Sequence, residues 1–341
     1  MVGADADPSL TADEAGQLAM LQIVLVGLGA GAAAALLFAS VASGSILATL
    51  LFYLAPLPIL IAALGWSHWA GLIASLTAAA GLGATLGFYF FSAFLVGVGL
   101  PAWWLGYLAL LARPVGSNGS MTLEWYPVGR LVLWAAIVGA VLVIVAIPNF
   151  GTDKESFEAG LRAAFERAIQ IQSRPGSPVS GADLERLFDI LVAAIPPAAA
   201  VLATLINVFN LWFAGRIVRV SGRLRRPWPD LSALALPSTT LGVLAVAIAG
   251  TFLPDLPGII CRIVAASLFM AYAVLGFAVL HALTRGLSFR AILLIAAYSA
   301  VIVLGWPVLA ASFLGLAEAA FNIRARSGGS RAPPSATTPT S

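Results

Sequence analysis

Between Glu14 and Arg113 the chain contains no Asp, Glu, Lys or Arg, and His68 is the one residue of that stretch that can carry a charge. A soluble domain needs charged side chains over its surface, and about a quarter of an average sequence is charged. In the hydrocarbon of a bilayer the demand is reversed, because each ionisable group there costs about 3 kcal/mol. With 60% hydrophobic and 10% charged residues, the sequence predicts an integral membrane protein whose constant partner is the lipid bilayer.

The composition also argues against several classes of function. Cys261 is the single cysteine, which excludes an intramolecular disulfide, and the two histidines, His68 and His281, are too few for a histidine metal cluster. No Ser-His-Asp set, Walker loop or zinc motif is present, and no expected span has an Asp, Glu or Lys near its middle. We therefore expect no cofactor, no metal and no enzymatic activity. The net charge of +3 comes from arginines in a few loops and requires no nucleic-acid partner.

Apolar runs of about 20 residues, each long enough to cross a bilayer once, recur along the chain. They predict an all-α, polytopic transmembrane bundle with about eight to ten membrane segments over residues 21–326. An acidic tail (1–20) precedes it, and a disordered tail rich in Ser, Gly, Pro and Thr (327–341) follows it. The stretch 291–320 has Gly305, Trp306 and Pro307 at its centre, so it is either one kinked helix or a tight hairpin. The other expected spans are 22–42, 46–64, 68–86, 88–112, 131–147, 196–216, 234–252 and 259–283.

The loop 152–195 is the one long stretch rich in charge, and it contains two apolar stripes. The first stripe is Phe157, Leu161, Phe165 and Ile169, and the second is Leu184, Leu187, Phe188, Leu191 and Ile195. These spacings predict two amphipathic helices separated by the turn-rich segment 173–181. The pair can lie on the membrane surface and cover the outer end of the bundle, which we favour, or form a lid over a substrate cavity.

A second loop is strongly basic and sets the predicted topology. It contains Arg216, Arg219, Arg223, Arg225 and Arg226. Because cytoplasmic loops are enriched in Lys and Arg, this loop is predicted to be cytoplasmic. Counting spans from it places 113–130, 285–290 and the N-terminus on the same side, and 152–195 outside. The arginines at 324, 326 and 331 belong on the cytoplasmic side too, which favours the hairpin for 291–320.

Polar and small residues inside the spans are the candidate functional residues. One side of the sixth span carries three polar residues, Thr204, Asn207 and Asn210. We favour a role in hydrogen bonding between helices. The alternative is the polar wall of a ligand cavity, which Trp306 could also line. A row of small residues on the first span allows another helix to approach closely, from this chain or from a partner. That row is Gly27, Gly31, Ala35 and Ala39. Glu318 and Arg324 are spaced for a local pair, to which we assign a surface role.

Several stretches together resemble a known family. They are APLPILIAALGW (55–66), PAWWLGYLALLAR (101–113), EWYPVGR (124–130), NVFNLWFAGR (207–216), SGRLRRPWPD (221–230) and GLAEAAFNIR (315–324). In these stretches the chain resembles the DUF2232 family of bacterial membrane proteins in its alphaproteobacterial form, from the first span to Arg324. The resemblance implies a multi-pass protein of the bacterial inner (plasma) membrane.

The DUF2232 family is similar, more distantly, to the substrate-binding S components of energy-coupling-factor transporters. That similarity implies a subunit that captures a small molecule and docks on a separate ATP-driven module, with the row Gly27, Gly31, Ala35 and Ala39 as the docking stripe. The alternative is a non-transporting membrane scaffold or envelope assembly factor, which would bind other membrane proteins through the arginine loop and the outer amphipathic loop. An enzyme would require an inward-facing pocket that contains Glu124, Tyr126 and Arg130.

Overall fold

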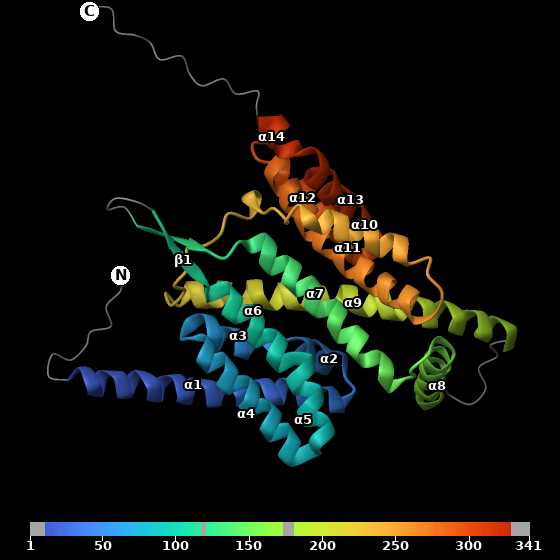
Figure 1. Ribbon diagram of the computed structural model, residues 1–341, viewed down its shortest axis with the longest axis horizontal. Helices are drawn as coiled ribbons and strands as arrows, with labels where there is room; N and C mark the ends of the chain where they lie inside the picture. Colours follow the sequence, from blue (N-terminus) through green and yellow to red (C-terminus); the bar gives the residue numbers. More distant parts are fainter. Residues whose placement is uncertain (1–10, 117–120, 173–180, 329–341) are drawn as a thin grey trace, which may run out of the picture.

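A computed structural model describes residues 11–116, 121–172 and 181–328, and it is almost entirely helical (Figure 1). The expected disorder at 329–341 and the turn at 173–180 lie outside the described residues. The helices are α1 Ala12–Ala39, α2 Ile46–Tyr53, α3 Pro56–Gly65, α4 His68–Leu86, α5 Phe88–Phe94, α6 Leu100–Leu110, α7 Val128–Ala146, α8 Lys154–Gln172, α9 Gly181–Val220, α10 Thr239–Gly250, α11 Asp255–Leu283, α12 Arg290–Leu304, α13 Pro307–Phe321 and α14 Ile323–Gly328.

The predicted polytopic bundle is confirmed. Seven helical segments of the described chain are long and apolar enough to cross a membrane. They are Gly16–Ser43, Ile46–Gly65, His68–Leu86, Phe88–Leu110, Val128–Asn149, Glu185–Val220 and Asp255–Leu283, while α10, α12 and α13 are apolar but shorter. The predicted loop 113–130 contains one element that an all-α class omits, an antiparallel hairpin of β1 (Ala112–Val115) and β2 (Thr122–Trp125).

In the N-terminal half of the chain, two helix boundaries differ from those expected. The first helix begins at Ala12, inside the expected tail, because Thr11 and Glu14 form a capping box that satisfies its first backbone N–H groups. The expected span 46–64 is broken into α2 and α3, because Pro56 has no N–H to continue the helix. This break frees the carbonyl of Tyr53, which another helix uses.

The expected start of a separate span at Pro196 is wrong. Helix α9 runs unbroken from Gly181 through Pro196 and Pro197 to Val220, so the second amphipathic stripe and the sixth span are one helix. At 40 residues it is about 60 Å long, roughly twice the hydrocarbon thickness. A proline inside a helix costs about 3 kcal/mol. Packing on both sides of the pair offsets that cost, because Val192 and Ala200 are both buried against neighbouring helices.

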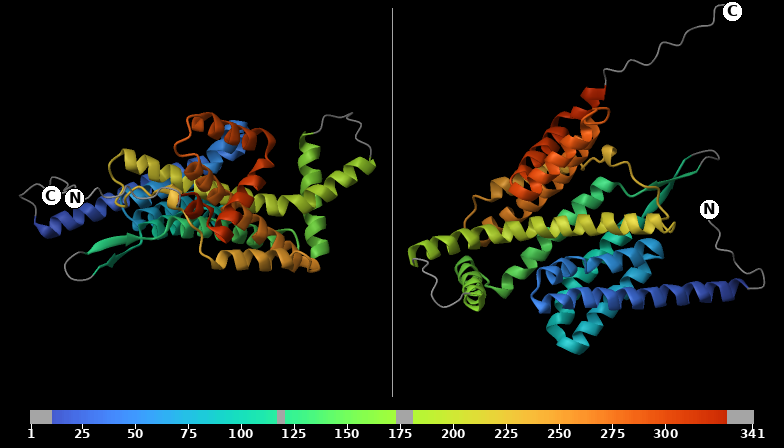
Figure 2. Two further views of the ribbon diagram at one scale, coloured as in Figure 1. Left: turned by 90° about the horizontal axis from the view of Figure 1, so that it is seen from above. Right: turned by 180° about the vertical axis from the view of Figure 1, so that it is seen from behind.

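The stretch 291–320 forms the hairpin and not the kinked helix. Gly305 has a φ of +73°, a left-handed conformation that ends α12, and α13 then returns alongside α11 (Figures 1 and 2). The ring of Tyr298 on α12 stacks on Phe277 of α11 with centroids 5.1 Å apart. On α13, a Cβ added at Gly315 would lie 2.0 Å from the carbonyl oxygen of Tyr272 on α11, so these two helices touch through their backbones.

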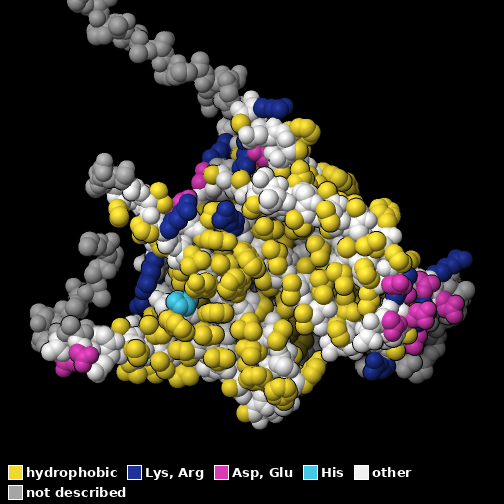
Figure 3. Space-filling model, in the orientation of Figure 1, with side chains coloured by type: hydrophobic (Ala, Val, Ile, Leu, Met, Phe, Trp, Pro, Cys, Tyr) yellow, Lys and Arg dark blue, Asp and Glu magenta, His cyan; other side chains and the backbone are white. Residues whose placement is uncertain are grey.

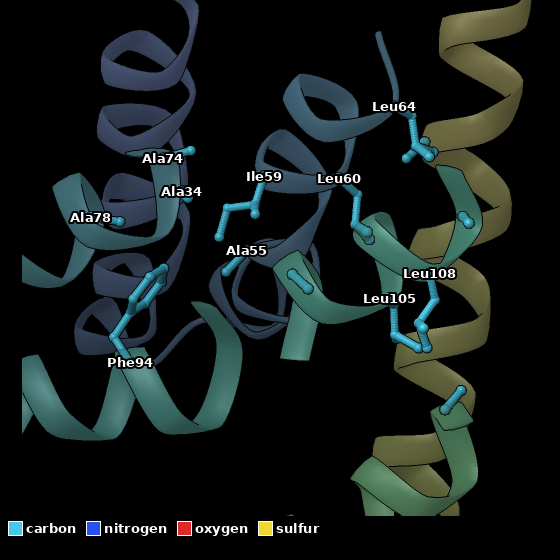
Figure 4. Close-up of a cluster of buried hydrophobic side chains, with 14 of the residues drawn as sticks. Ala34, Ala55, Ile59, Leu60, Leu64, Ala74, Ala78, Phe94, Leu105 and Leu108 are labelled. Atoms are coloured by element: carbon cyan, nitrogen blue, oxygen red, sulfur yellow. The ribbon is translucent and has the colours of Figure 1, made fainter. Parts of the chain in front are cut away.

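The small-residue row on α1 packs on α4. A Cβ added at Gly31 would lie 2.6 Å from the Ala74 carbonyl oxygen, and one at Gly27 would lie 2.7 Å from the Ile73 side chain. Figure 4 shows Ala34 of α1 beside Ala74 and Ala78 of α4, in the largest apolar cluster of the fold. This part of the row is therefore filled by the same chain, which was one of its two expected uses.

Candidate functional site: the arginine-rich end

One end of the bundle gathers loops that are far apart in the sequence. Arg226 reaches the end of α6 and the start of α7, where its guanidinium donates hydrogen bonds to the carbonyl oxygens of Ala109 (3.3 Å) and Tyr126 (3.0 Å). Arg285, after α11, forms an ion pair with Asp230 (3.0 Å). The loops 113–130, 216–230 and 285–290 thus share one side, as predicted from their arginines. The acidic side chains around α8 lie at the opposite end (Figure 3).

Two tryptophans hold the basic loop in shape. The guanidinium of Arg223 lies 4.4 Å from the ring centroid of Trp66, at the end of α3. Trp228 folds back against α9, where its ring would lie 3.6 Å from a Cβ added at Gly215. The guanidinium groups of Arg216 and Arg219 lie 5.5 and 4.9 Å from the centroid of that same ring. Each contact is a cation–π interaction, which fixes the position of an exposed cation without neutralising it.

The five arginines differ in what they can do. Arg226 is partly buried, and this burial lowers the pKa of its guanidinium. It therefore serves as an anchor for the loop. Arg216, Arg219, Arg223 and Arg225 are exposed. We call all five arginines, Arg226 included, together with Trp66 and Trp228, the arginine face.

A second polar group lies inside the bundle. Thr204 of α9 is fully buried, and its hydroxyl shares a 2.8 Å hydrogen bond with Ser267 of α11. The Ser267 hydroxyl donates in turn to the carbonyl oxygen of Ala136 on α7. Asn210 donates from Nδ2 to the freed carbonyl oxygen of Tyr53 at 2.9 Å. Thr204 and Asn210 therefore join α9 to three other helices, as expected for interhelical hydrogen bonding.

We call the polar residues between α9 and its neighbouring helices the seam. Some polar atoms near it lack partners among the described residues. These are Nδ2 of Asn207, Oδ1 of Asn210 and the hydroxyl of Tyr272, all buried. A buried polar atom without a partner is costly, and it is often satisfied by water or a ligand. Trp306 does not join this group, because it stands 65% exposed at the turn between α12 and α13.

Glu318 and Arg324 form a buried ion pair, so the expected surface role is wrong. The distance from Arg324 Nε to Glu318 Oε1 is 2.8 Å, and the side chains are only 18% and 4% exposed respectively. Arg324 also donates to the carbonyl oxygen of Leu234, 2.8 Å away in the loop before α10. The spacing revealed the pair, but its burial depends on Leu234, which is remote in the sequence.

The amphipathic helix α8 covers the end of the bundle opposite the arginine-rich end. Phe157 and Leu161 are buried, in one cluster with Ile259 and Ile263 of α11. One void beneath α8, lined by residues that include Phe157 and Arg262, measures about 10 Å³, which is room for about one water molecule. A second, open hollow of about 430 Å³ lies at the start of α8 and is lined by residues that include Asp153 and Asp255. A covering role is thus confirmed for α8. Its placement on the membrane surface stays a prediction.

Two of the three residues required for an inward-facing enzyme pocket are exposed. Glu124 is exposed on β2 and forms an ion pair with Arg113 at 2.6 Å, whereas Arg130 is exposed on α7. Tyr126 accepts a 3.1 Å hydrogen bond from the indole of Trp134. Within 11–116, 121–172 and 181–328, no cluster of three or more His, Cys, Asp or Glu residues could hold a metal ion.

A comparison with family models agrees with this architecture. The model described as "Predicted membrane protein (DUF2232)" matches residues 32–318. The chain belongs to the DUF2232 family. No curated protein and no solved structure matches it significantly.

The DUF2232 match covers most of the candidate site but not its edges. It includes the arginine face and the seam residues Thr204, Asn207 and Asn210. It leaves out Gly27 and Gly31, the half of the small-residue row that packs on α4, and also Arg324. The arginine face is therefore a feature of the DUF2232 region itself.

Proposed function

We propose that this multi-pass membrane protein is a non-transporting scaffold that holds an acidic protein partner at its arginine face. The observation that carries the proposal is the fixed geometry of the exposed cations. Arg223 is stacked on Trp66, and Arg225 stands beside Arg226, which is anchored to two backbone carbonyl oxygens. By the positive-inside rule the partner is cytoplasmic.

Fixed cations favour binding for an energetic reason. A free arginine side chain loses about 2 kcal/mol of rotamer entropy when it is immobilised. Stacking on an indole removes part of that cost before the partner arrives, while the guanidinium keeps its donors for carboxylate groups. Arg223 is placed in this way, and it lies close in sequence to the exposed Arg225.

In-cell photo-crosslinking tests this proposal. A photoreactive amino acid at the exposed Pro227 should give one reproducible crosslinked protein in cells. The double variant Arg223→Gln/Arg225→Gln should reduce that product at least tenfold. A control with the same charge change, Lys154→Gln/Arg167→Gln on α8, should leave it unchanged. An equal yield in all three proteins would reject the arginine face as the docking surface.

A second candidate function is the capture of a small molecule by a subunit of S-component type. It is supported by the unpartnered atoms of Asn207, Asn210 and Tyr272, which a small polar molecule could satisfy. In this candidate Thr204 would complete the ligand residues, whereas Trp306, exposed at the turn between α12 and α13, would not. The partly buried Ala35 and Ala39 would then contact an ATP-driven module.

Native mass spectrometry separates the two candidates. Small-molecule capture predicts an additional mass on gently extracted protein that disappears in Asn207→Leu. The scaffold predicts no such mass, and Asn207→Leu would then be neutral or stabilising because it removes an unpartnered amide.

A further inference from the structure

One face of α9 is exposed along its whole apolar length and ends in two arginines. The exposed residues are spaced by three and four positions, so they form one straight strip on the helix. They are Leu202, Leu205, Phe209, Trp212, Arg216 and Arg219. From Leu205 to Arg216 the strip is about 16 Å long, which is close to the thickness of one leaflet's hydrocarbon.

The apolar part of the strip is aromatic close to the arginines. The rings of Trp212 and Phe213 are stacked with centroids 6.4 Å apart, and the ring of Phe209 lies 6.2 Å from that of Trp212. Trp is enriched where hydrocarbon meets the headgroups, which places Trp212 just inside this boundary. The arginines, one and two turns further along, then lie at the level of the phosphates.

The two arginines are arranged for an anion. Both guanidinium groups lie against the single ring of Trp228, at 5.5 and 4.9 Å, and neither forms a hydrogen bond or ion pair with another described residue. Two like charges three positions apart on a helix repel each other, and an anion between them removes that repulsion. Phosphate oxygens accept short, charge-assisted hydrogen bonds from guanidinium groups.

We propose that Arg216, Arg219 and Trp228 bind the phosphate of an anionic phospholipid, whose acyl chains lie along Phe209 and Trp212. The predicted cytoplasmic placement agrees with this occupant, because that leaflet carries the anionic lipids. The lipid site uses Arg216, Arg219 and Trp228 of the arginine face, whereas the protein partner is proposed at Arg223 and Arg225 of the same face. Either can fail without the other.

Native mass spectrometry of the purified full-length protein, stripped of lipid in a neutral detergent, tests this site. Titrated phosphatidylglycerol should bind, and phosphatidylcholine with the same acyl chains should bind at least tenfold more weakly. Arg216→Gln/Arg219→Gln should weaken phosphatidylglycerol binding roughly thirtyfold, as expected for two interfacial arginines. The control Arg113→Gln/Arg130→Gln removes the same charge from exposed residues at the same end and should bind as the parent does.

Further measurements identify the part of the lipid that is recognised. Inorganic phosphate in large excess should not displace the lipid, and Phe209→Ala/Trp212→Ala should weaken lipid binding, because the acyl chains contribute. Displacement by inorganic phosphate would indicate a free-phosphate site and overturn the proposal. Unchanged binding in the Arg216→Gln/Arg219→Gln variant, with its thermal unfolding also unchanged, would overturn it as well.

Discussion

The substitution Glu318→Gln tests how strongly burial changes the energy of an ion pair. Glu318 accepts hydrogen bonds from both the side chain and the backbone N–H of Arg324, at 2.8 and 3.0 Å, and it is 4% exposed. Removing one partner of a buried pair leaves the other charge uncompensated, which costs about 3–5 kcal/mol. Glutamine can still accept one hydrogen bond, and Arg324 keeps the Leu234 carbonyl oxygen. We therefore expect a loss of about 3 kcal/mol, the lower end of that range.

The matched control is Glu124→Gln. The Arg113–Glu124 pair is equally short, at 2.6 Å, but its side chains are 76% and 50% exposed. Exposed pairs contribute at most about 1 kcal/mol. Unfolding in mixed micelles with increasing SDS, followed by tryptophan fluorescence, should give the free energy of unfolding of each variant. Equal losses for the two substitutions, or less than about 1 kcal/mol for Glu318→Gln, would refute the reasoning.

Other predictions concern helix contacts and one helix cap. Gly315→Ala should reduce stability by about 1–3 kcal/mol, since its Cβ would lie 2.0 Å from the Tyr272 carbonyl oxygen; Gly242→Ala, with open space around it, should be neutral by the same unfolding assay. Ser267→Ala should cost about 1 kcal/mol, because it removes the hydrogen bonds to Thr204 and to the Ala136 carbonyl oxygen, while the Thr204 hydroxyl keeps the carbonyl oxygen of Ala200. The pKa of Asp153 is lowered by hydrogen bonds from the backbone N–H and hydroxyl of the first turn of α8. The cap is therefore complete at neutral pH and lost as pH falls below about 4, so the protection of the amides at the start of α8, taken relative to the intrinsic exchange rate at each pH, should fall in acid, but not in Asp153→Asn.

Local signals predicted some boundaries well. The span 68–86 was placed correctly because Ser67 caps the first turn of α4, and Gly87 ends the helix with a φ of +98°. The long run without charge predicted the membrane class for an equally direct reason, since bilayer insertion excludes charges wherever they occur in the sequence. Both signals act over short distances along the chain, or act on composition alone.

Errors arose where packing overrode a local rule. Prolines end many helices, yet Pro196 and Pro197 lie inside α9, because the helix is held by buried contacts on both sides. Pro56 does interrupt a helix, and the Tyr53 carbonyl oxygen left free at that break accepts a hydrogen bond from Asn210, 157 residues away. No local pattern distinguishes these two cases.

The charged residues of the candidate site could be predicted from the sequence, but the surface that they form together could not. The arginine count identified the loop and predicted its side of the membrane. The contacts that fix it, Arg223 on Trp66 and Arg226 on Ala109, join segments more than a hundred residues apart. The parts played by Trp66 and Trp228 could not be predicted, because a sequence does not show which arginine a tryptophan will meet.

The most direct test of the central claim is native mass spectrometry of the protein released from its own membrane, compared with Arg223→Gln/Arg225→Gln. The scaffold predicts a bound protein mass on the parent chain that is absent from the variant. A small-molecule mass other than phospholipid that both proteins retain, with no bound protein on either, would contradict it and favour capture within the bundle.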